Sequence, residues 1–556
     1  MKWHFNELQT GFDYQGIRDG DIEVFDKTRY QSVVRESIQN SLDARLDYSK
    51  PVKIEFNFFK VEKKELPGIE EIENVLKYSS RWDKANKDDQ ALLNKMIDSI
   101  EEKAYSCLEI ADYNTRGMQA KTTFDSFAHA RNVSTKSSGT SAGSKGMGKA
   151  AYFALSYLRT LVVSSIYYEN KERLFQGISR VSTFPKEDKL YNYKGYYSTT
   201  IEPETTFDAV SDRFKRDEVG TSIFVLGLWK NENGITLMKK ELVNHFWLAI
   251  LENDLIVTID GEEINRSNIY ELIKRLYPSI EESSQYNSNP NPRAYFETYI
   301  GEKCIQKVFT KKIEHLGEVK LILGKNNQFQ GRIANFRLSK MLIYKDPSFL
   351  YKGYCGVFVC LDPKGNEILK KLENATHTEW KLNNWKDPIG KKALNEYKNF
   401  IINSVNEFIV REDKGEITID AFDDLLQFTG NQTVNDKGQN AVDKPSKVVV
   451  RKVKSEGVSE YIPKSFNWIR NRVVKTSNGF EYHIDMDSKV NQNSIYFEIL
   501  VGNDDSSSKI NITSLNKGDF NENRIALTLM KGTNHVVLKL DDFLKHTIRL
   551  KEIEAL

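Results

Sequence analysis

The stretch Arg35-Glu-Ser-Ile-Gln-Asn-Ser-Leu-Asp-Ala-Arg45 is the most informative part of this 556-residue sequence. On a helix that turns roughly 100° per residue, Glu36, Asn40 and Asp43 fall within about 60° of one another. A carboxylate and a carboxamide four residues apart reach one small volume, where the carboxylate can polarise a water and the amide oxygen can bind Mg²⁺. Solvated helix faces also carry Glu and Asn at this spacing, so the rest of the chain has to decide between the two interpretations.

Apolar residues at helical spacing occupy the other side of this helix: Val34, Ile38 and Leu42. They predict a helix over about 30–47 that packs on a sheet. Alternating apolar residues predict strands at 52–59 and 107–111. The highly charged segment 65–103 between them has helical spacing and is interpreted as an inserted helical excursion.

The composition is that of an ordinary soluble protein with several domains. Hydrophobic residues make up 39% and charged residues 28% of the chain, and a chain of this length needs two to four cores. Lys plus Arg (80) nearly balances Asp plus Glu (78), which argues against general coating of nucleic acid. No apolar run approaches the roughly 20 residues that span a bilayer, and no secretory signal is visible. The cysteines lack zinc-ligand spacing, which favours a reduced, cytoplasmic protein.

Changes in pattern along the chain predict a mixed α/β, multidomain protein. Residues 1–230 are predicted to form one α/β domain. Residues 231–414 are predicted to form a second α/β region that begins and ends with a helix. Residues 415–447 are interpreted as a linker, because much of this segment is polar and poor in large apolar side chains. Short alternating strands with Gly, Asn and Asp turns then predict a small β-sandwich over 448–556.

A glycine-rich segment, Ser138-Gly-Thr-Ser-Ala-Gly-Ser-Lys-Gly-Met-Gly-Lys-Ala-Ala151, predicts a phosphate-binding loop. Gly143, Gly146 and Gly148 let backbone amides approach an anion closely. Lys149 opens a helix whose N-terminus favours negative charge. A flexible linker fits less well, because the segment runs directly into an apolar helix.

Two common phosphate loops fit this segment poorly. Gly143 to Lys149 satisfies the beginning of a Walker A loop, G-x-x-x-x-G-K, but Ala150 stands where Ser or Thr would hold Mg²⁺. The preceding residues are also polar, whereas a Walker A loop follows an apolar strand. The dinucleotide fingerprint G-x-G-x-x-G is absent.

The order of the motifs resembles that of the GHKL superfamily, which includes DNA gyrase B subunits, heat-shock chaperone ATPases, histidine kinases and MutL proteins. The helix itself resembles most the one in MutL and microrchidia-type ATPases. The resemblance covers about 20–230 and extends weakly to 414. It rests on four groups of residues: Glu36, Asn40 and Asp43; Asp112 with Gly117 and Met118; Gly143, Gly146 and Gly148; and Gly220, Thr221 and Ser222.

This resemblance implies a Bergerat-type α/β sandwich ATPase domain followed by a transducer-like domain. It implies that Glu36 is the general base for the attacking water and that Asn40 is the Mg²⁺ ligand. Asp112 would accept a hydrogen bond from the adenine amino group, and Thr221 would reach the same network through water. Asp43 is included among the nucleotide-binding residues.

The same resemblance assigns the remaining contacts to glycine-rich loops. Gly117 and Met118 would line the base pocket. The lid over the phosphates would consist of Gly143, Ser144, Lys145, Gly146, Met147, Gly148 and Lys149. The family usually places its glycine four residues after the aspartate, whereas Gly117 is five after Asp112, so the pocket around Tyr113 and Asn114 is open to question.

Gyrase and MutL relatives also send a lysine from the second domain to the terminal phosphate. The candidates here are Lys325, Arg337 and Lys340, and the sequence does not choose among them.

The sequence therefore predicts an ATP- and Mg²⁺-dependent switch that hydrolyses ATP and forms a nucleotide-dependent homodimer. A protein effector is expected to dock on the C-terminal domain, DNA is left open as a partner, and no membrane contact is expected. Fold-level analogy suggests bacterial DNA management or phage defence. Two alternatives remain: a nucleotide-gated scaffold with negligible turnover, and a protein kinase on the same fold.

Overall fold

The chain folds into two compact units, residues 1–347 with 352–409 and residues 348–351 with 410–556. The structure is a computed structural model. It describes residues 1–9, 13–66, 68–82, 86–101, 103–129, 148–280, 291–346, 353–374, 379–382, 385–408, 416–418, 466–476, 479–488, 491–503, 506–508, 512–540 and 548–553.

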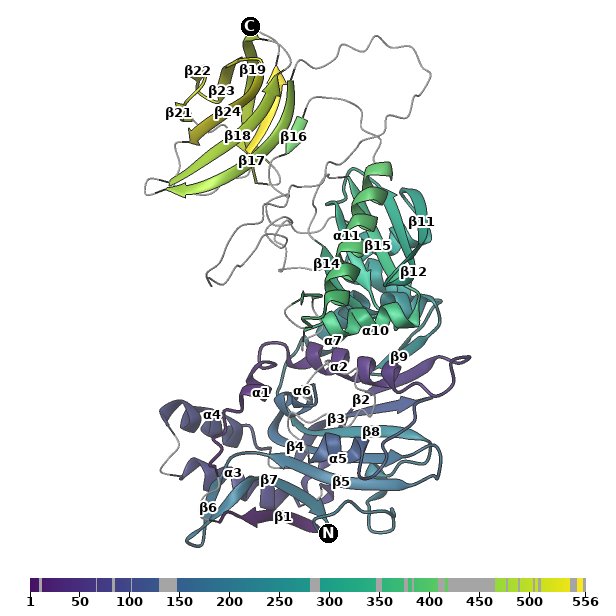
Figure 1. Ribbon diagram of the computed structural model, residues 1–556. Helices are drawn as coiled ribbons and strands as arrows, with labels where there is room; N and C mark the ends of the chain where they lie inside the picture. Colours follow the sequence, from purple (N-terminus) through teal and green to yellow (C-terminus); the bar gives the residue numbers. More distant parts are fainter. Residues whose placement is uncertain are drawn as a thin grey trace. The chain divides into compact units, whose positions relative to one another are not determined.

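The first unit contains a ten-stranded sheet (Figure 1). In spatial order its strands are β1 (Lys2–Glu7), β7 (Lys189–Ser198), β5 (Arg173–Arg180), β4 (Ser156–Ile166), β8 (Gly220–Leu228), β3 (Ala104–Tyr113), β2 (Val52–Glu62), β9 (Leu255–Ile259) and β10 (Glu262–Ile264), with β6 (Phe184–Lys186) beside β7. Neighbouring strands are antiparallel except for β2 and β9, which pair in parallel. The first sheet therefore extends past residue 230 into the region expected to form the second domain.

Helices cover both faces of this sheet. Successive side chains of each strand point to opposite faces, so each strand contributes to both cores. On β3, Leu108 and Ile110 join the core beneath α2 (Arg29–Asp43), α5 (Thr123–Ala128), α6 (Ala150–Leu155) and α7 (Gly234–Leu251). Tyr105 and Cys107 point the other way and pack with α3 (Ile69–Ser80) and α4 (Lys87–Asp98). The charged segment 65–103, which was expected to form a helical excursion, thus supplies the helices that cover the second face of the sheet.

The helix that carries Glu36 follows its predicted pattern. α2 buries Val34, Ile38 and Leu42 in the core on this face of the sheet. It ends at Asp43 rather than at residue 47. The chain after it is organised by the buried guanidinium of Arg45, which donates hydrogen bonds to the carbonyl of Lys50 at 2.7 Å and to the carboxylate of Asp254 at 2.9 Å.

A second, five-stranded sheet lies in the same unit. Its strands, in spatial order, are β11 (Ile305–Ile313), β12 (Gly317–Lys325), β15 (Tyr354–Cys360), β13 (Arg332–Phe336) and β14 (Leu342–Asp346). The accompanying helices are α8 (Ile269–Leu276), α9 (Arg293–Ile300), α10 (Pro363–Leu372) and α11 (Pro388–Phe408). The α/β character expected for this region is confirmed.

The second unit consists of two facing sheets. One contains β16 (Glu416–Thr418), β25 (Ile548–Ile553), β19 (Gln492–Asn503), β23 (Arg524–Leu529) and β22 (Asp519–Asn521), with β20 (Ser506–Ser508) on β19. The other contains β17 (Phe466–Thr476), β18 (Gly479–Ser488), β24 (Gly532–Leu540) and β21 (Ile512–Leu515). Apolar side chains from both sheets form one core, including Ile484, Phe497 and Leu538. The β-rich C-terminal region is confirmed, and with it the mixed α/β multidomain class.

Candidate functional site

The glycine-rich segment ends against the acidic helix. Glu36 on α2 is buried, with 5% of its surface exposed. A Cβ added to Gly148 would stand 2.0 Å from Glu36 Oε2 and 3.0 Å from its Cδ, so only glycine fits at this position without displacing the carboxylate. The other lid candidates, Gly143, Ser144, Lys145, Gly146 and Met147, lie outside the described residues.

Asn40 is exposed on the same side of α2, beside the buried hydroxyl of Tyr152. The Ser37 hydroxyl donates a hydrogen bond to the Tyr152 oxygen at 3.1 Å. Burial raises the pKa of Tyr152, and hydrogen bonds with Ser37 and Asn40 oppose this shift. An accessible amide oxygen next to a carboxylate matches the hard oxygen ligands that Mg²⁺ prefers, so Asn40 and its surroundings fit the metal that the motifs imply.

Asp112 lies at the end of β3 in a nearly complete hydrogen-bond network. Its Oδ1 accepts from the Thr115 hydroxyl at 2.5 Å and from the Thr221 backbone amide at 2.8 Å. Its Oδ2 accepts from the Ser41 hydroxyl at 3.1 Å. An ionised carboxylate offers about four acceptor positions, so with respect to the described residues one position on Oδ2 is left for an N–H donor.

The contact between Asp112 and Thr221 is direct, through the backbone. The Thr221 hydroxyl bonds instead to the Ser165 hydroxyl at 3.0 Å, which also accepts from the backbone amide of Met118 at 2.8 Å. Asp112, Thr221 and Met118, which are far apart in the sequence, are thereby joined in one polar network.

The loop after Asp112 has a conformation that requires glycine. Gly117 has φ +69°, and a Cβ there would stand 2.1 Å from the carbonyl oxygen of Ile166. The loop therefore runs directly along β4. Asn114, with φ +58°, turns away from this strand, and its side chain bonds to backbone groups of Asp47 and Lys50.

Sequence reasoning missed several residues that position Asp112. Arg216 is buried and donates hydrogen bonds to the backbone carbonyl of Asp112 and to the hydroxyl of Ser222. Gly220, with φ +128°, leaves room for this guanidinium, because a Cβ would stand 2.3 Å from Arg216 Nη2. Ser41 and Ser165 were missed as well. Gly220 and Ser222 belong to a motif that the sequence showed, whereas Arg216, Ser41 and Ser165 occur in no recognisable spacing.

Lys149 lies immediately before α6, and its ammonium donates a hydrogen bond to the carbonyl of Ser126 at 2.7 Å. Burial lowers the pKa of Lys149 to about 7, and the positive charges of Lys194 and Arg180 add to this shift, while Asp21 opposes it. A lysine in this state gains protonation when an anion arrives, because an opposite charge favours the charged amine.

Asp43 faces cations from the second α/β region. Its two carboxylate oxygens lie 3.7 Å from Arg337 Nη2 and 3.4 Å from Lys370 Nζ. Arg337 is 2% exposed and pairs also with the buried Glu373 at 3.3 Å. Of the three cations considered for the terminal phosphate, Arg337 is thus the one placed beside α2.

The other two cations have different surroundings. Lys340 is paired with Glu252 at 2.5 Å and with Asp254. Lys325 is exposed at the end of β12. The assignment of a cation to the phosphate remains a prediction.

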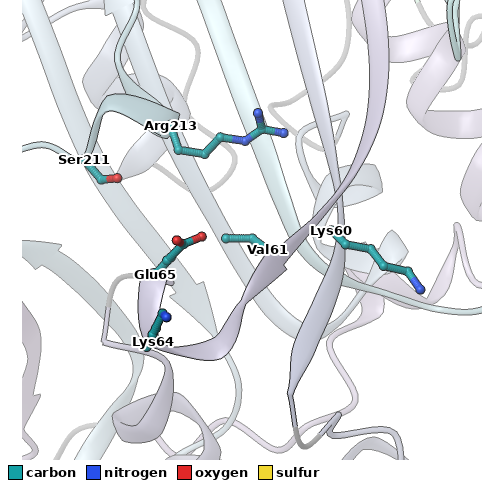
Figure 2. A pocket seen from close by; sticks show the side chains of 6 residues that line it. All are labelled: Lys60, Val61, Lys64, Glu65, Ser211 and Arg213. Atoms are coloured by element: carbon teal, nitrogen blue, oxygen red, sulfur yellow. The ribbon is translucent and has the colours of Figure 1, made fainter.

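A separate hollow of about 500 Å³ lies where β2 meets the 3₁₀ helices η1 (Lys63–Glu65) and η2 (Asp212–Phe214). Figure 2 shows its lining side chains, which carry three positive charges and one negative charge: Lys60, Val61, Lys64, Glu65, Ser211 and Arg213. The Arg213 guanidinium stacks 3.9 Å from the centre of the Phe59 ring. Those predicted site residues that the structure describes do not line this hollow.

The chain is similar to two solved structures of gyrase B. The first is the 43K ATPase domain of gyrase B from Thermus thermophilus, solved with an aminocoumarin, at 11% identity and a TM-score of 0.26 over 68% of this chain and 93% of that one. The second is the B subunit of DNA gyrase from Myxococcus xanthus, at 9% identity and a TM-score of 0.31 over 70% of this chain and 97% of that one. No protein-family model matches the chain, and no curated protein matches it.

Two further expectations can be compared with the structure. The cysteines are free thiols, three of them buried and Cys304 partly so. Within the described parts of the chain, no helix is both long and apolar enough to cross a membrane.

Proposed function

We propose that this chain binds ATP with Mg²⁺ and hydrolyses it, as a member of the GHKL group of ATPases. The observation that carries the proposal is the contact between Gly148 and Glu36, because it brings the end of an anion-binding glycine segment to a buried carboxylate. Asp112, which has one open acceptor position, supports the proposal because it can accept a hydrogen bond from the adenine base.

Each residue has a role that follows from its surroundings. Glu36 orients and deprotonates the attacking water, and Asn40 supplies an oxygen ligand to the metal. Bound Mg²⁺ neutralises charge on the phosphates. Lys149 and the glycine segment hold the phosphate oxygens, since in-line phosphoryl transfer needs positioning and charge stabilisation more than covalent help.

Asp112 provides a reason for adenine selectivity. The open position on Oδ2 needs a donor, and the exocyclic group of adenine is an N–H donor, whereas guanine presents a carbonyl oxygen at the same place. A carboxylate facing that carbonyl leaves two acceptors without a proton between them, which is unfavourable in a partly buried site. Gly117 and Met118 complete the wall around the base.

The hydrolysis cycle is proposed to act as a switch. ATP would order the glycine segment over the phosphates, two chains would pair in this state, and hydrolysis would release them. The β-sandwich is proposed as the docking module for a protein effector, in DNA management or phage defence. Light scattering with a non-hydrolysable ATP analogue and Mg²⁺ tests the pairing, and a protein that stays monomeric would refute it.

Calorimetry with ATP and Mg²⁺, followed by steady-state turnover, tests the central proposal. Glu36→Gln should retain binding and lose about 10²- to 10⁴-fold in turnover, the usual contribution of a general base. Glu70→Gln, on an exposed position of α3, is the matched control and should behave as wild type.

Two measurements separate the alternatives. Binding without turnover in the wild-type chain would indicate a nucleotide-gated scaffold. Labelled phosphate on the protein after incubation with γ-labelled ATP would indicate a kinase. Absence of any heat of binding from folded protein would overturn the assignment.

A further inference from the structure

A second cavity, of about 230 Å³, lies on the face of the large sheet that α3 and α4 cover. Its walls come from four parts of the chain: the segment before α1, the end of α3, the first turns of α4, and the connection between β5 and β6. The side chains that matter for its chemistry are Tyr14, Ser79, Trp82, Asp89 and Ser182. None of the described residues that are proposed to bind ATP lines it.

Three residues that line this cavity each carry a buried polar atom without a hydrogen-bond partner among the described residues: Ser79 Oγ, Asp89 Oδ1 and Ser182 Oγ. Their residues are 0%, 8% and 2% exposed. Buried polar groups in native proteins are almost always satisfied, since an unsatisfied one loses its bonds to water without compensation. Three of them around one cavity indicate that an occupant with hydrogen-bonding groups belongs there.

The charges around the cavity favour a positive occupant. Of the cations that the structure describes, Arg18 lies nearest to Asp89, with its Nε 3.9 Å from Oδ1, too far for a hydrogen bond. Arg18 is half-exposed and also lies near Glu23, at 3.5 Å, and Asp88, at 3.9 Å. Three carboxylates share one guanidinium, so among the described residues the buried Asp89 has no counter-ion within hydrogen-bond distance.

The aromatic wall suits a cation as well. Trp82 and Tyr14 meet edge to face, with ring centres 5.7 Å apart. Aromatic faces attract ammonium and guanidinium groups, and Trp does so most strongly. Tyr14 is half-exposed, whereas Trp82 is buried, so the tyrosine marks the side open to solvent.

The size of the cavity limits the ligand. One water occupies about 30 Å³ of liquid, so 230 Å³ holds about eight waters. This is enough for a small amine or guanidine and far too little for a nucleoside triphosphate.

The walls are held in place before any ligand arrives. Gln15 and Thr183 exchange two hydrogen bonds, at 2.8 and 3.0 Å, which fix the segment before α1 to the strand connection. Asn86 caps α4 by accepting from the backbone amide of Asp89 at 2.8 Å. Preorganised polar groups of this kind favour binding because little ordering is needed.

We propose that this cavity binds a compact organic cation with N–H donors, a guanidinium or a primary ammonium group, with its nitrogen on Asp89 and its body against Trp82. The hydroxyls of Ser79 and Ser182 accept the remaining N–H groups. A free small molecule and an arginine side chain of another polypeptide present the same chemistry. The site is independent of the proposed ATPase function.

Calorimetry on the full chain with propylguanidine, and with its neutral analogue propylurea, tests the proposal. Propylguanidine should bind and raise the melting temperature, whereas propylurea should do neither. Asp89→Asn should weaken binding at least tenfold, and Asp88→Asn, at a side chain that is 76% exposed, is the matched control and should leave binding intact.

Ser182→Ala provides a second variant that keeps every charge, and it should weaken binding several-fold in a protein with an unchanged circular dichroism spectrum. Agmatine and N-acetyl-arginine amide then distinguish the source: tighter binding of agmatine indicates a free small molecule, and tighter binding of N-acetyl-arginine amide indicates an arginine side chain of a polypeptide. Equal binding of propylurea, no binding of any cation, or affinity unchanged by Asp89→Asn would overturn the proposal and leave a water-filled cavity.

Discussion

Gly148 lies against the carboxylate of Glu36, so close that a methyl group at position 148 would stand 2.0 Å from Oε2. One of these residues ends a glycine-rich segment, and the other lies in the middle of a helix far earlier in the chain. Their contact links the part that is proposed to hold phosphate with the part that is proposed to activate water.

Gly148→Ala should disable the site through this contact. The added methyl overlaps a buried carboxylate, and overpacking of this kind costs about 1–3 kcal/mol. We expect a lower melting temperature and loss of ATP turnover. In the Glu36→Ala background the overlap is removed, so the same substitution should then cost little stability. Gly20→Ala is the control, because a Cβ there meets nothing within 4 Å. Full activity of Gly148→Ala would contradict the described contact.

Asp112→Asn should reduce ATP affinity and selectivity. The amide replaces one carboxylate oxygen by a donor, so either the Thr221 amide or the adenine amino group loses its acceptor. Loss of one such hydrogen bond costs about 1–3 kcal/mol, or roughly 5- to 150-fold in affinity. Competition binding of ATP against GTP measures the selectivity. Asp212→Asn, at a side chain that is 95% exposed, should change neither quantity. Unchanged preference for ATP in Asp112→Asn would exclude Asp112 as the base reader.

ATP affinity should fall as the pH rises above about 7, because the pKa of Lys149 is lowered to about 7 from its ordinary 10.5. Above that pH the free protein holds a neutral amine, which must take up a proton to pair with phosphate. The slope should approach tenfold per pH unit between about pH 7.5 and 9, where the phosphates are fully ionised. Calorimetry in buffers of different ionisation enthalpy detects the proton uptake, and Lys149→Met should abolish it. A flat profile in the wild-type protein would remove Lys149 from phosphate binding.

The same group affects stability with a defined sign. Folding disfavours the charged amine, so the unfolded chain binds one more proton between about pH 7 and 10.5. The contribution of Lys149 to stability therefore rises with pH across this window. Between pH 7 and pH 10 the melting temperature of the wild type should rise relative to that of Lys149→Met. A wild-type melting temperature that falls relative to that of the variant over this range would contradict the sign.

Asp43 should couple energetically to Lys370 across the two sheet regions of the first unit. The pair is 3.4 Å apart and about three-quarters buried on each side. A double-mutant cycle with Asp43→Asn and Lys370→Met should give a coupling of about 0.5–1 kcal/mol. Lys371→Met, whose ammonium lies 4.9 Å from the centre of the Trp385 ring, serves as the uncoupled neighbour. If Asp43→Asn lowers the ATP affinity and the cycle shows no coupling between Asp43 and Lys370, the nucleotide-binding role of Asp43 is favoured instead.

Local periodicity explains what was predictable about the fold. Val34, Ile38 and Leu42 repeat at helical spacing, and the resulting helix buries all three. The strand expected at 107–111 occurs as β3, because alternation of apolar residues reflects which sheet face each side chain meets. By contrast β1 was not expected, since its pairing with β7 depends on a partner far along the chain.

The sequence by itself determined the residue types of the candidate site: a carboxylate and a carboxamide on one helix, an aspartate after a strand, and glycines before a lysine. Each is a short-range pattern set by helix and strand geometry. Only the tertiary structure placed Gly148 on Glu36, joined Asp112 to Ser41 and Thr221, and gave Asp43 its partners Arg337 and Lys370. These contacts depend on how strands order themselves in a sheet, and no local spacing encodes which distant hydroxyl or cation will meet a given carboxylate.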